Sequence, residues 1–360
     1  MNTKYYPVLK TSVSELRALK SLRDHDFSSV VPLFELTKSR KSKHNQGCDV
    51  YRKIDELAKI MDDKPFILDL TNEESLSNEQ IDSFFDEDNS FYNWTNFIHR
   101  IIDDKKVNVI PTILAYEDSE PISLYKQARR LLEKCEKICI RLSVQWAGED
   151  ITYELIQLAS ELEDVIIVID LGLTRRDEYD TNINDARSII EEILATDESI
   201  DIVLVSSSFP SSVVQEVPKK ENMSNKIEMF TRKIYEELSD LYPGIIYGDY
   251  GCIHPFRGES KPMVWIPRID YPYSHYLAFE RCRREDGGYI ECAIQISSLP
   301  DYKKHRIDCW GIDEIDSASE GFLNGKNPSF WISVRSNIHM TRMARLIQKE
   351  NTLQSRVSNF

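Results

Sequence analysis

The run from Val165 to Gly172 places the strongest constraint on the fold of this chain. It begins with five consecutive β-branched residues and then reaches Asp170. Such a run favours a strand that is buried on both faces, as in a parallel sheet. An unpaired carboxylate inside that strand would carry a large desolvation cost, so we expect Asp170 at its exposed carboxyl end.

Short apolar runs of this kind alternate with amphipathic helical stretches eight times within the first 255 residues. This alternation is typical of a parallel sheet covered by helices. The predicted strands are Tyr5–Lys10, Val30–Leu36, Pro65–Leu70, Val107–Leu114, Ile138–Ser143, Val165–Leu171, Ile200–Val205 and Gly244–Asp249. The first helix is marked by Ser12 and Glu15, which have the spacing of a capping box.

Eight such units in about 250 residues predict an α/β fold with a closed (β/α)₈ barrel, like a TIM barrel. An open doubly wound sheet is the alternative, but the turn after the first strand lacks the glycines of a phosphate-binding loop. We predict a barrel at residues 1–255 and a C-terminal α+β extension at 256–360 that completes and caps it. Within the extension, we expect strands at Met263–Ile266, Tyr289–Ile296 and Phe330–Val334, and a helix from Asn337 to Gln348.

Composition narrows the class of protein. No apolar run is long enough to span a membrane, so we expect a cytoplasmic protein without a membrane partner. The seven cysteines form no CxxC pair, which argues against a structural zinc site. The net charge of −15 disfavours a general nucleic-acid coat.

The charge is unevenly distributed along the chain. From Arg257 onward there are 15 Lys and Arg against 13 Asp and Glu. If nucleic acid binds at all, we expect it at this C-terminal segment, where Tyr271–Tyr276 and three arginines (Arg281, Arg283 and Arg284) are close in sequence. The alternative, which is based on the charge asymmetry, is that the tyrosines pack the extension against the barrel. The arginines are then attracted to the acidic surface of the barrel.

Several segments resemble one known family, the beta protein family of phage, prophage and bacterial defence-island proteins, for which we expect a type member in phage T4. The similar segments cover nearly the whole chain: Tyr6–Lys10, Ser14–Leu19, Pro32–Glu35, Ser208–Ser212 and Tyr247–Gly251. Similar proteins carry a paired-histidine segment before the last helix, where this chain has the single His339. The resemblance implies a role in conflict between phage and bacterium and does not imply a particular reaction.

Charged residues stand at the ends of six of the eight predicted strands. They are Lys10, Glu35, Asp69, Arg141, Asp170 and Asp249. Because the carboxyl ends of barrel strands meet at one mouth, we predict that these side chains form the catalytic site.

Three interpretations of this set remain open. In the first, Glu35, Asp69, Asp170 and Asp249 hold Mg²⁺ or Mn²⁺ while Lys10 and Arg141 receive a phosphate-bearing small molecule. In the second, two carboxylates hydrolyse a glycoside. In the third, the charges form a buried salt-bridge lattice without chemistry.

Further ligand-binding candidates are Ser206, Ser207, Ser208, Tyr250, His254 and His339. The serines either hold a phosphate or cap the next turn, and the histidines either reach the mouth or are surface groups. Taken together, the sequence predicts a phage-related protein that is either a metal-dependent hydrolase acting on a phosphorylated or nucleotide substrate, or a recognition protein for a phage or host protein. Whether it is an enzyme stays open at this point.

Overall fold

The barrel sheet consists of the eight apolar runs that the sequence predicts as strands. The computed structural model describes residues 4–212, 222–257 and 265–357. Eight parallel strands lie in the order β4-β3-β2-β1-β9-β7-β6-β5. They are β1 (Tyr6–Lys10), β2 (Leu33–Leu36), β3 (Phe66–Leu70), β4 (Val109–Pro111), β5 (Ile138–Ser143), β6 (Val165–Leu173), β7 (Asp201–Ser207) and β9 (Ile246–Asp249).

The two edge strands of this sheet approach each other. Thr112, just after β4, forms a parallel bridge with Cys139 of β5, and the Ile113 amide donates to the Cys139 carbonyl at 2.8 Å. The sheet is therefore a nearly closed barrel surrounded by helices, and the predicted TIM-barrel-like fold is confirmed.

Each strand buries both faces, and its alternate residues belong to two different cores. In β6, Ile166 and Val168 contact the cluster that fills the barrel, whereas Ile167 and Ile169 contact the cluster between the barrel and its helices. This two-residue period is the reason that continuous β-branched runs suit the sheet. It also decides which strand-end residues face the mouth.

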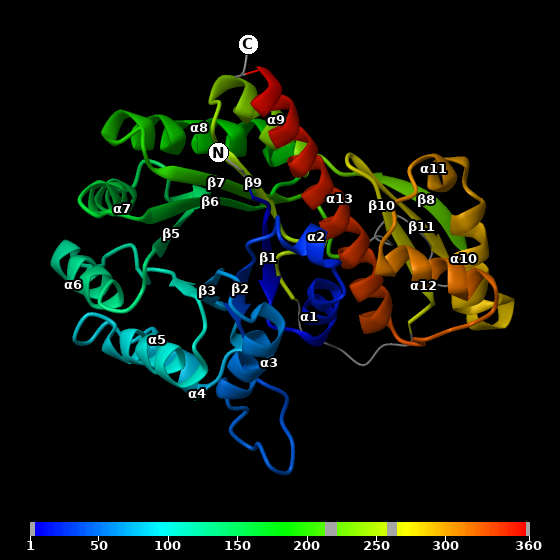
Figure 1. Cartoon of the computed structure of the whole chain (residues 1–360), viewed down its shortest axis with the longest axis horizontal. Helices are drawn as coiled ribbons and strands as arrows, with labels where there is room; N and C mark the ends of the chain where they lie inside the picture. The colour runs from blue at the N-terminus through cyan, green and yellow to red at the C-terminus, as the bar shows by residue number, and fades with distance from the viewer. Residues whose placement is uncertain (1–3, 213–221, 258–264, 358–360) are drawn as a thin grey trace.

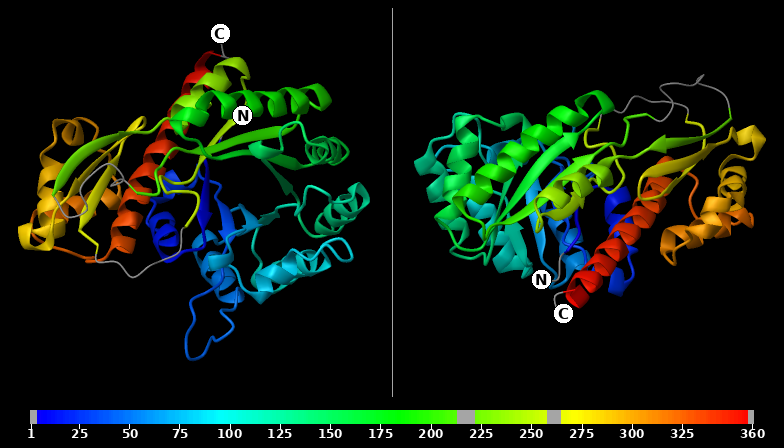
Figure 2. Two further views of the ribbon diagram at one scale, coloured as in Figure 1. Left: turned by 180° about the vertical axis from the view of Figure 1, so that it is seen from behind. Right: turned by 90° about the horizontal axis from the view of Figure 1, so that it is seen from above.

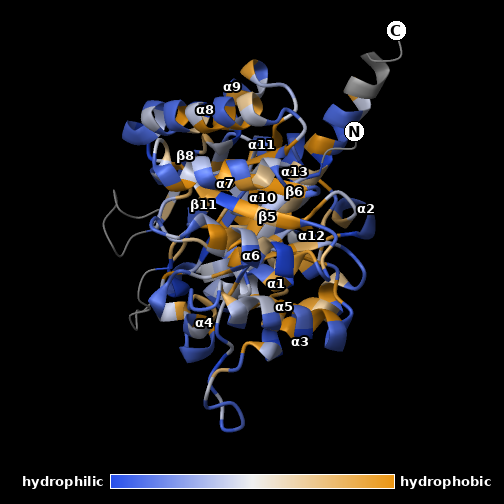
Figure 3. Ribbon diagram, turned by 90° about the vertical axis from the view of Figure 1, so that its left-hand side faces the viewer, coloured by the Kyte–Doolittle hydropathy of each residue, from blue (hydrophilic) through white to orange (hydrophobic). Residues whose placement is uncertain are grey.

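Amphipathic helices cover the outside of the barrel, as the views in Figure 2 show. They are α1 (Val13–Lys20), α2 (Asp24–Phe27), α3 (Tyr51–Met61), α4 (Glu79–Phe84), α5 (Tyr92–Lys105), α6 (Pro121–Leu131), α7 (Asp150–Ser160), α8 (Tyr179–Thr196) and α9 (Thr231–Leu241). The predicted cap of α1 is present, since the Ser12 hydroxyl accepts from the Glu15 amide. Colouring by hydropathy places apolar residues along the inner strands and mixed residues on the helices (Figure 3).

The last helix, α13 (Pro328–Val357), lies in the outer layer of the barrel. Its Met340, Met343, Ala344 and Ile347 belong to the main core. The helix packs against α1 and against the smaller sheet, and in Figure 1 it separates that sheet from the barrel.

A three-stranded antiparallel sheet lies on the far side of α13. Its strands are β10 (Arg268–Pro272), β11 (Tyr276–Arg281) and β8 (Met223–Glu228), in that order. Helices α10 (Gly288–Ser298), α11 (Pro300–Lys304) and α12 (Trp310–Ser319) complete this unit, which has its own apolar core. Because β8 precedes residue 255 in the chain yet pairs with β11, the smaller sheet draws on both predicted domains, and the boundary at 255/256 stays a prediction.

Two strands predicted in the C-terminal segment are wrong. Residues 289–296 lie in α10 and residues 330–334 lie in α13. In α10 the buried residues Tyr289, Cys292, Ala293 and Ile296 recur every three to four positions, a helical period that is hard to distinguish from a strand in a short apolar run. The predicted strand at 263–266 falls partly outside the described residues, and Trp265 and Ile266 are not in a strand.

The predicted helix at 337–348 lies within α13. No helix in the described part of the chain combines the length and the apolar character that a membrane crossing requires.

Candidate functional site

Five of the six predicted strand-end charges converge at the carboxyl-end mouth of the barrel. Lys10 and Glu35 are partners in the pairing of β1 with β2, and Glu35 and Asp69 are partners in that of β2 with β3. Arg141 of β5 and Asp170 of β6 complete the group. All five occupy positions two residues beyond apolar residues of the barrel interior, so the two-residue period directs them inward.

The guanidinium of Arg141 is the centre of this group. Its Nη1 donates to Asp69 at 2.7 Å, its Nη2 donates to Glu35 at 2.9 Å, and its Nε donates to Asp170 at 2.9 Å. Tyr250 lies 2.9 Å from Arg141 Nη2 and donates its hydroxyl hydrogen to Asp170 at 2.7 Å. One cation therefore links carboxylates from three strands, which is the geometry of a buried ion-pair network.

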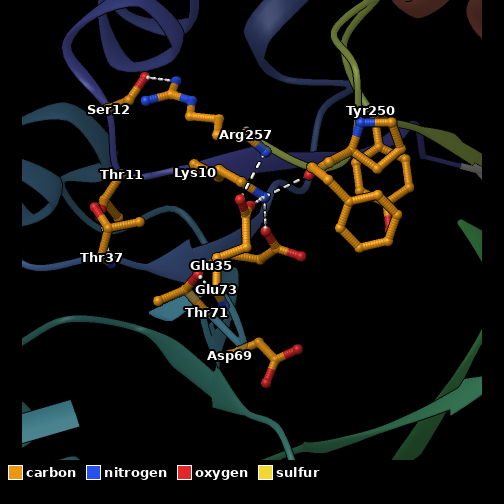
Figure 4. Close-up of polar contacts among 12 residues, drawn as sticks. Lys10, Thr11, Ser12, Glu35, Thr37, Asp69, Thr71, Glu73, Tyr250 and Arg257 are labelled. Atoms are coloured by element: carbon orange, nitrogen blue, oxygen red, sulfur yellow. Dashed lines mark hydrogen bonds and ion pairs between the residues drawn. The ribbon is translucent and has the colours of Figure 1, made fainter. Parts of the chain in front are cut away.

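Lys10 is the second cation of the mouth. It pairs with Glu35 and, at 3.0 Å, with Glu73, and it donates to the Pro255 carbonyl at 2.7 Å. Figure 4 shows its side chain reaching from β1 to both carboxylates and to the loop after β9. Lys10 thus connects the loop after β9 to the charged residues at the mouth of the barrel.

The environments of Glu35 and Asp69 move their pKa values in opposite directions. Burial acts to raise the pKa of Glu35, but Arg141 and Lys10 together outweigh it and hold that pKa below its usual value. Burial raises the pKa of Asp69 above its usual value, because Arg141 offsets the desolvation only in part. Glu35 therefore keeps its charge more readily than its neighbour, and Asp69 takes up a proton more readily.

A cavity of about 670 Å³ opens above this group. Its floor includes Lys10, Glu35, Asp69, Arg141 and Asp170, and its walls come from the loops after β3, β4, β5, β6 and β9. A cavity of this size and position is typical of ligand sites in barrels of this type.

The four carboxylates proposed as metal ligands do not form a fitting donor set. Both oxygens of Glu35, of Asp69 and of Asp170 already accept a hydrogen bond from Lys10, Arg141 or a backbone amide. Among the residues that the structure describes, no three His, Cys, Asp or Glu side chains are grouped to hold one ion.

Asp249 lies apart from the other five charges. Its neighbour Tyr247 belongs to the core between the barrel and its helices, while Tyr250 belongs to the barrel interior. Asp249 is two residues after Tyr247, so its side chain points to the same, outer face of the sheet. There, His339 of α13 lies 2.6 Å away. The expectation that all four carboxylates surround one mouth is therefore wrong for Asp249, because the two-residue period of β9 turns it the other way.

The carboxylate of Asp249 is fully engaged. The hydroxyls of Tyr5 and Tyr247 donate to it at 2.5 and 2.7 Å, and the Gly251 amide donates at 2.7 Å. Burial acts to raise the pKa of Asp249, but His339 and the two tyrosines outweigh it and lower that pKa.

His339 connects this cluster to a small pocket. Its Nδ1 is buried without a hydrogen-bond partner among the described residues. The residue lines a pocket of about 20 Å³, together with Ser206, Asp249 and Tyr250, which is room for about one water molecule.

The three serines take different directions. Ser206 lines the pocket beside Asp249, and the Ser207 hydroxyl donates to the Ile253 carbonyl at 3.2 Å. The Ser207 hydroxyl also accepts from the Phe209 amide at 3.2 Å, a local bond of the kind that the capping alternative expects, whereas the Ser208 hydroxyl accepts from the distant Phe230 amide at 3.0 Å. His254 lies in the loop over the mouth, where its ring contacts the backbone of Phe256.

The tyrosines of the C-terminal segment pack within the smaller unit. Tyr271 and Tyr273 are buried in its core and contact each other edge to face. Tyr273 stacks on Tyr276 with ring centroids 4.2 Å apart. They are packing residues, but they pack inside the smaller unit and not, as the alternative expected, between the extension and the barrel.

Sequence reasoning missed Glu73 and Arg257, which extend the network around Lys10. The Arg257 guanidinium contacts Ser12 and Glu15, and its backbone amide donates to Glu73. Both residues lie in loops, so no strand-end pattern marks them. The capping pair of Ser12 and Glu15, which Arg257 contacts, is the part of this network that the sequence predicts.

Comparison with known proteins gives one consistent result. The family model described as "Beta protein" matches residues 5–345. The "Protein beta" of Enterobacteria phage P4 is 30% identical over 354 residues, which cover 96% of this chain and 94% of that protein. This relative comes from phage P4 and not from phage T4, where a type member was expected.

Proposed function

This chain belongs to the Beta protein family, and from that premise we propose that it is a hydrolase of a phage-related setting whose reaction takes place at the mouth of the barrel. The observation that carries the proposal is the adjacent pair of carboxyl groups, Glu35 and Asp69, on the floor of the 670 Å³ cavity, where their surroundings move their pKa values in opposite directions. Neighbouring carboxyl groups with separated pKa values are suited to different roles in acid–base catalysis.

Asp69 is the proton-transfer group of this proposal. Its raised pKa favours the protonated form, which donates its proton to the leaving group as a water molecule attacks in the same displacement, and the proton that the water loses restores the Asp69 carboxyl group. Glu35 and Asp170 pair with Arg141 and hold its guanidinium in place. Tyr250 adds a hydroxyl at the same floor.

The test compares the full-length protein with its Asp69→Asn variant on small-molecule extracts of phage-infected bacteria. Mass spectrometry should detect a compound that the unchanged protein consumes and the variant consumes at least about 100-fold more slowly. Asp103→Asn, at an exposed ion pair with Lys134, is the matched control and should keep full activity. If no compound is consumed, or if both variants consume it equally, the proposal is wrong.

A metal-dependent form of the proposal, in which the substrate is phosphorylated or a nucleotide, predicts a different result. Activity should then disappear with EDTA and return with Mg²⁺ or Mn²⁺. The bonded carboxylate oxygens of the floor favour the metal-independent form, in which EDTA has no effect.

A second candidate function is recognition of a phage or host protein without catalysis. The observation in its favour is that the floor carboxylates and Arg141 satisfy one another, as they do in a structural lattice. Affinity capture from infected cells, followed by mass spectrometry, should then recover the same partner with the unchanged protein and with Asp69→Asn. Recovery of no specific partner would contradict this candidate.

A further inference from the structure

We propose that the mouth cavity takes an organic cation, a compound that carries an amine or guanidinium group. The inference rests on the proposed function, since it names the substrate class of the same site. It follows from the charge of the cavity lining, the pairing of its two cations and the aromatic residues of its walls.

Negative charge exceeds positive charge among the described residues that line the cavity. The cations are Lys10 and Arg141, and the acidic residues are Glu35, Asp69, Asp170, Asp177 and Glu178. Neither cation is available to an anionic ligand, because Lys10 already pairs with two carboxylates and Arg141 with three. A phosphate at this floor would meet more repulsion than attraction.

The rim offers carboxylates that a cation can reach. Asp177 is exposed, and no cation in the described part of the chain lies within ion-pair distance of it. Glu178 pairs at 3.4 Å with the exposed Arg175 and accepts from the Arg175 backbone amide at 3.1 Å, so Asp177 is the more accessible of the two carboxylates. On the floor, the pKa of Asp69 is raised even beside Arg141, so an additional positive charge there would favour its ionised form.

Aromatic residues supply the walls. Tyr116, Trp146, Tyr250 and Phe256 line the cavity, and Tyr116 and Phe256 are exposed. Aromatic faces attract ammonium and guanidinium groups and also cover the apolar part of an organic ligand. The cavity volume suits an organic molecule better than a bare ion.

The experiment is calorimetric titration of the full-length protein at low ionic strength with three probes. Putrescine carries two ammonium groups, 1,4-butanediol has hydroxyls in their place, and inorganic phosphate is the anion. We expect putrescine to bind and the affinities for butanediol and phosphate to be at least tenfold weaker. Tighter binding of phosphate or of butanediol, or no binding of putrescine, would overturn the inference.

A pair of variants places the binding at the cavity. Asp177→Asn removes a rim charge and should weaken putrescine binding about two- to fivefold, as expected for an exposed ion pair. Asp180→Asn removes an exposed charge from α8, outside the cavity lining, and should leave the affinity unchanged. Equal effects of the two variants would show a nonspecific charge effect and would overturn the inference.

The outcomes separate this inference from the proposed function. Turnover that depends on Asp69, with a substrate that is neutral or anionic, would remove the inference and leave the hydrolase proposal standing. Specific putrescine binding without any turnover dependent on Asp69 would support the inference and contradict the hydrolase proposal.

Discussion

At the scale of single residues, the mouth of the barrel is organised by Arg141. It lies on β5, and its one guanidinium holds three carboxylates from three other strands. Such a group is stable only as a whole, because each carboxylate left without its cation becomes an uncompensated buried charge. Arg141 therefore acts on stability and on the site together.

Replacing Arg141 by methionine should lower the free energy of unfolding by about 3–5 kcal/mol at pH 7.5. Without the guanidinium, the pKa values of Glu35 and Asp69 rise, so both groups take up a proton more readily as the pH falls and the uncompensated buried charge decreases. The deficit should therefore be smaller at pH 5 than at pH 7.5 in urea unfolding experiments. Arg100→Met, at an exposed pair with Asp104, should change stability by no more than about 0.5 kcal/mol at either pH.

Asp249 makes a second pH-dependent contribution. Its folded-state pKa lies below its usual value, so its stabilising contacts are fully present above about pH 4 and are lost as the pH falls through the folded pKa. Asp249→Asn should therefore be less stable than the unchanged protein at pH 7, and the two stability curves should converge in acid. Parallel curves from pH 7 to pH 3 would show that the carboxylate charge does not contribute.

At the scale of elements, α13 connects the barrel to the smaller sheet. Asn337 donates to the Ala18 carbonyl of α1 at 3.0 Å and accepts from the Gly311 amide of α12 at 2.9 Å. Arg345 of the same helix pairs with Asp26 at 2.8 Å. One helix therefore sets the positions of α1, α2 and α12.

The contact between α12 and α13 requires glycine at position 311. A Cβ there would lie 2.6 Å from the Val334 carbonyl oxygen and 2.6 Å from Ile338 Cγ1. Gly311→Ala should therefore destabilise the protein by about 1–3 kcal/mol through overpacking, measured by urea unfolding. Gly47→Ala, where a Cβ would meet nothing within 4 Å, is the control and should have a small effect.

At the scale of the whole molecule, the barrel core is completed by residues from the end of the chain. Met340, Met343, Ala344 and Ile347 contribute fully or almost fully buried side chains to it. His339, whose ring lies 2.6 Å from the carboxylate of Asp249, comes from the same helix. The barrel and the C-terminal segment should therefore fold together.

A chain that ends at residue 255 tests this dependence. It lacks α13, so it exposes part of the barrel core and leaves Asp249 without His339. We expect no cooperative thermal unfolding by circular dichroism, in contrast to the full-length protein. A monomeric fragment with a cooperative transition would show that the predicted barrel domain is independent.

The eight strands and the charged residues at their ends could be predicted from the amino-acid sequence alone. Continuous β-branched runs have few alternatives to a buried parallel strand, and the polar residue that follows such a run must lie at its end. Tertiary structure decided which of these ends meet. Asp170 faces Arg141 inside the barrel whereas Asp249 faces His339 outside it, and the difference is one position in a two-residue period.

The C-terminal segment was less predictable from sequence for a related reason. Its apolar runs in α10 and α13 are short and fit both a helix and a strand, and the polar strand β8 pairs with a partner about fifty residues later. Which of these structures forms depends on packing between segments that are distant in the chain. The local sequence pattern predicts the barrel strands because they are buried on both faces. The contacts of the other helices and strands are set only when the whole molecule has folded.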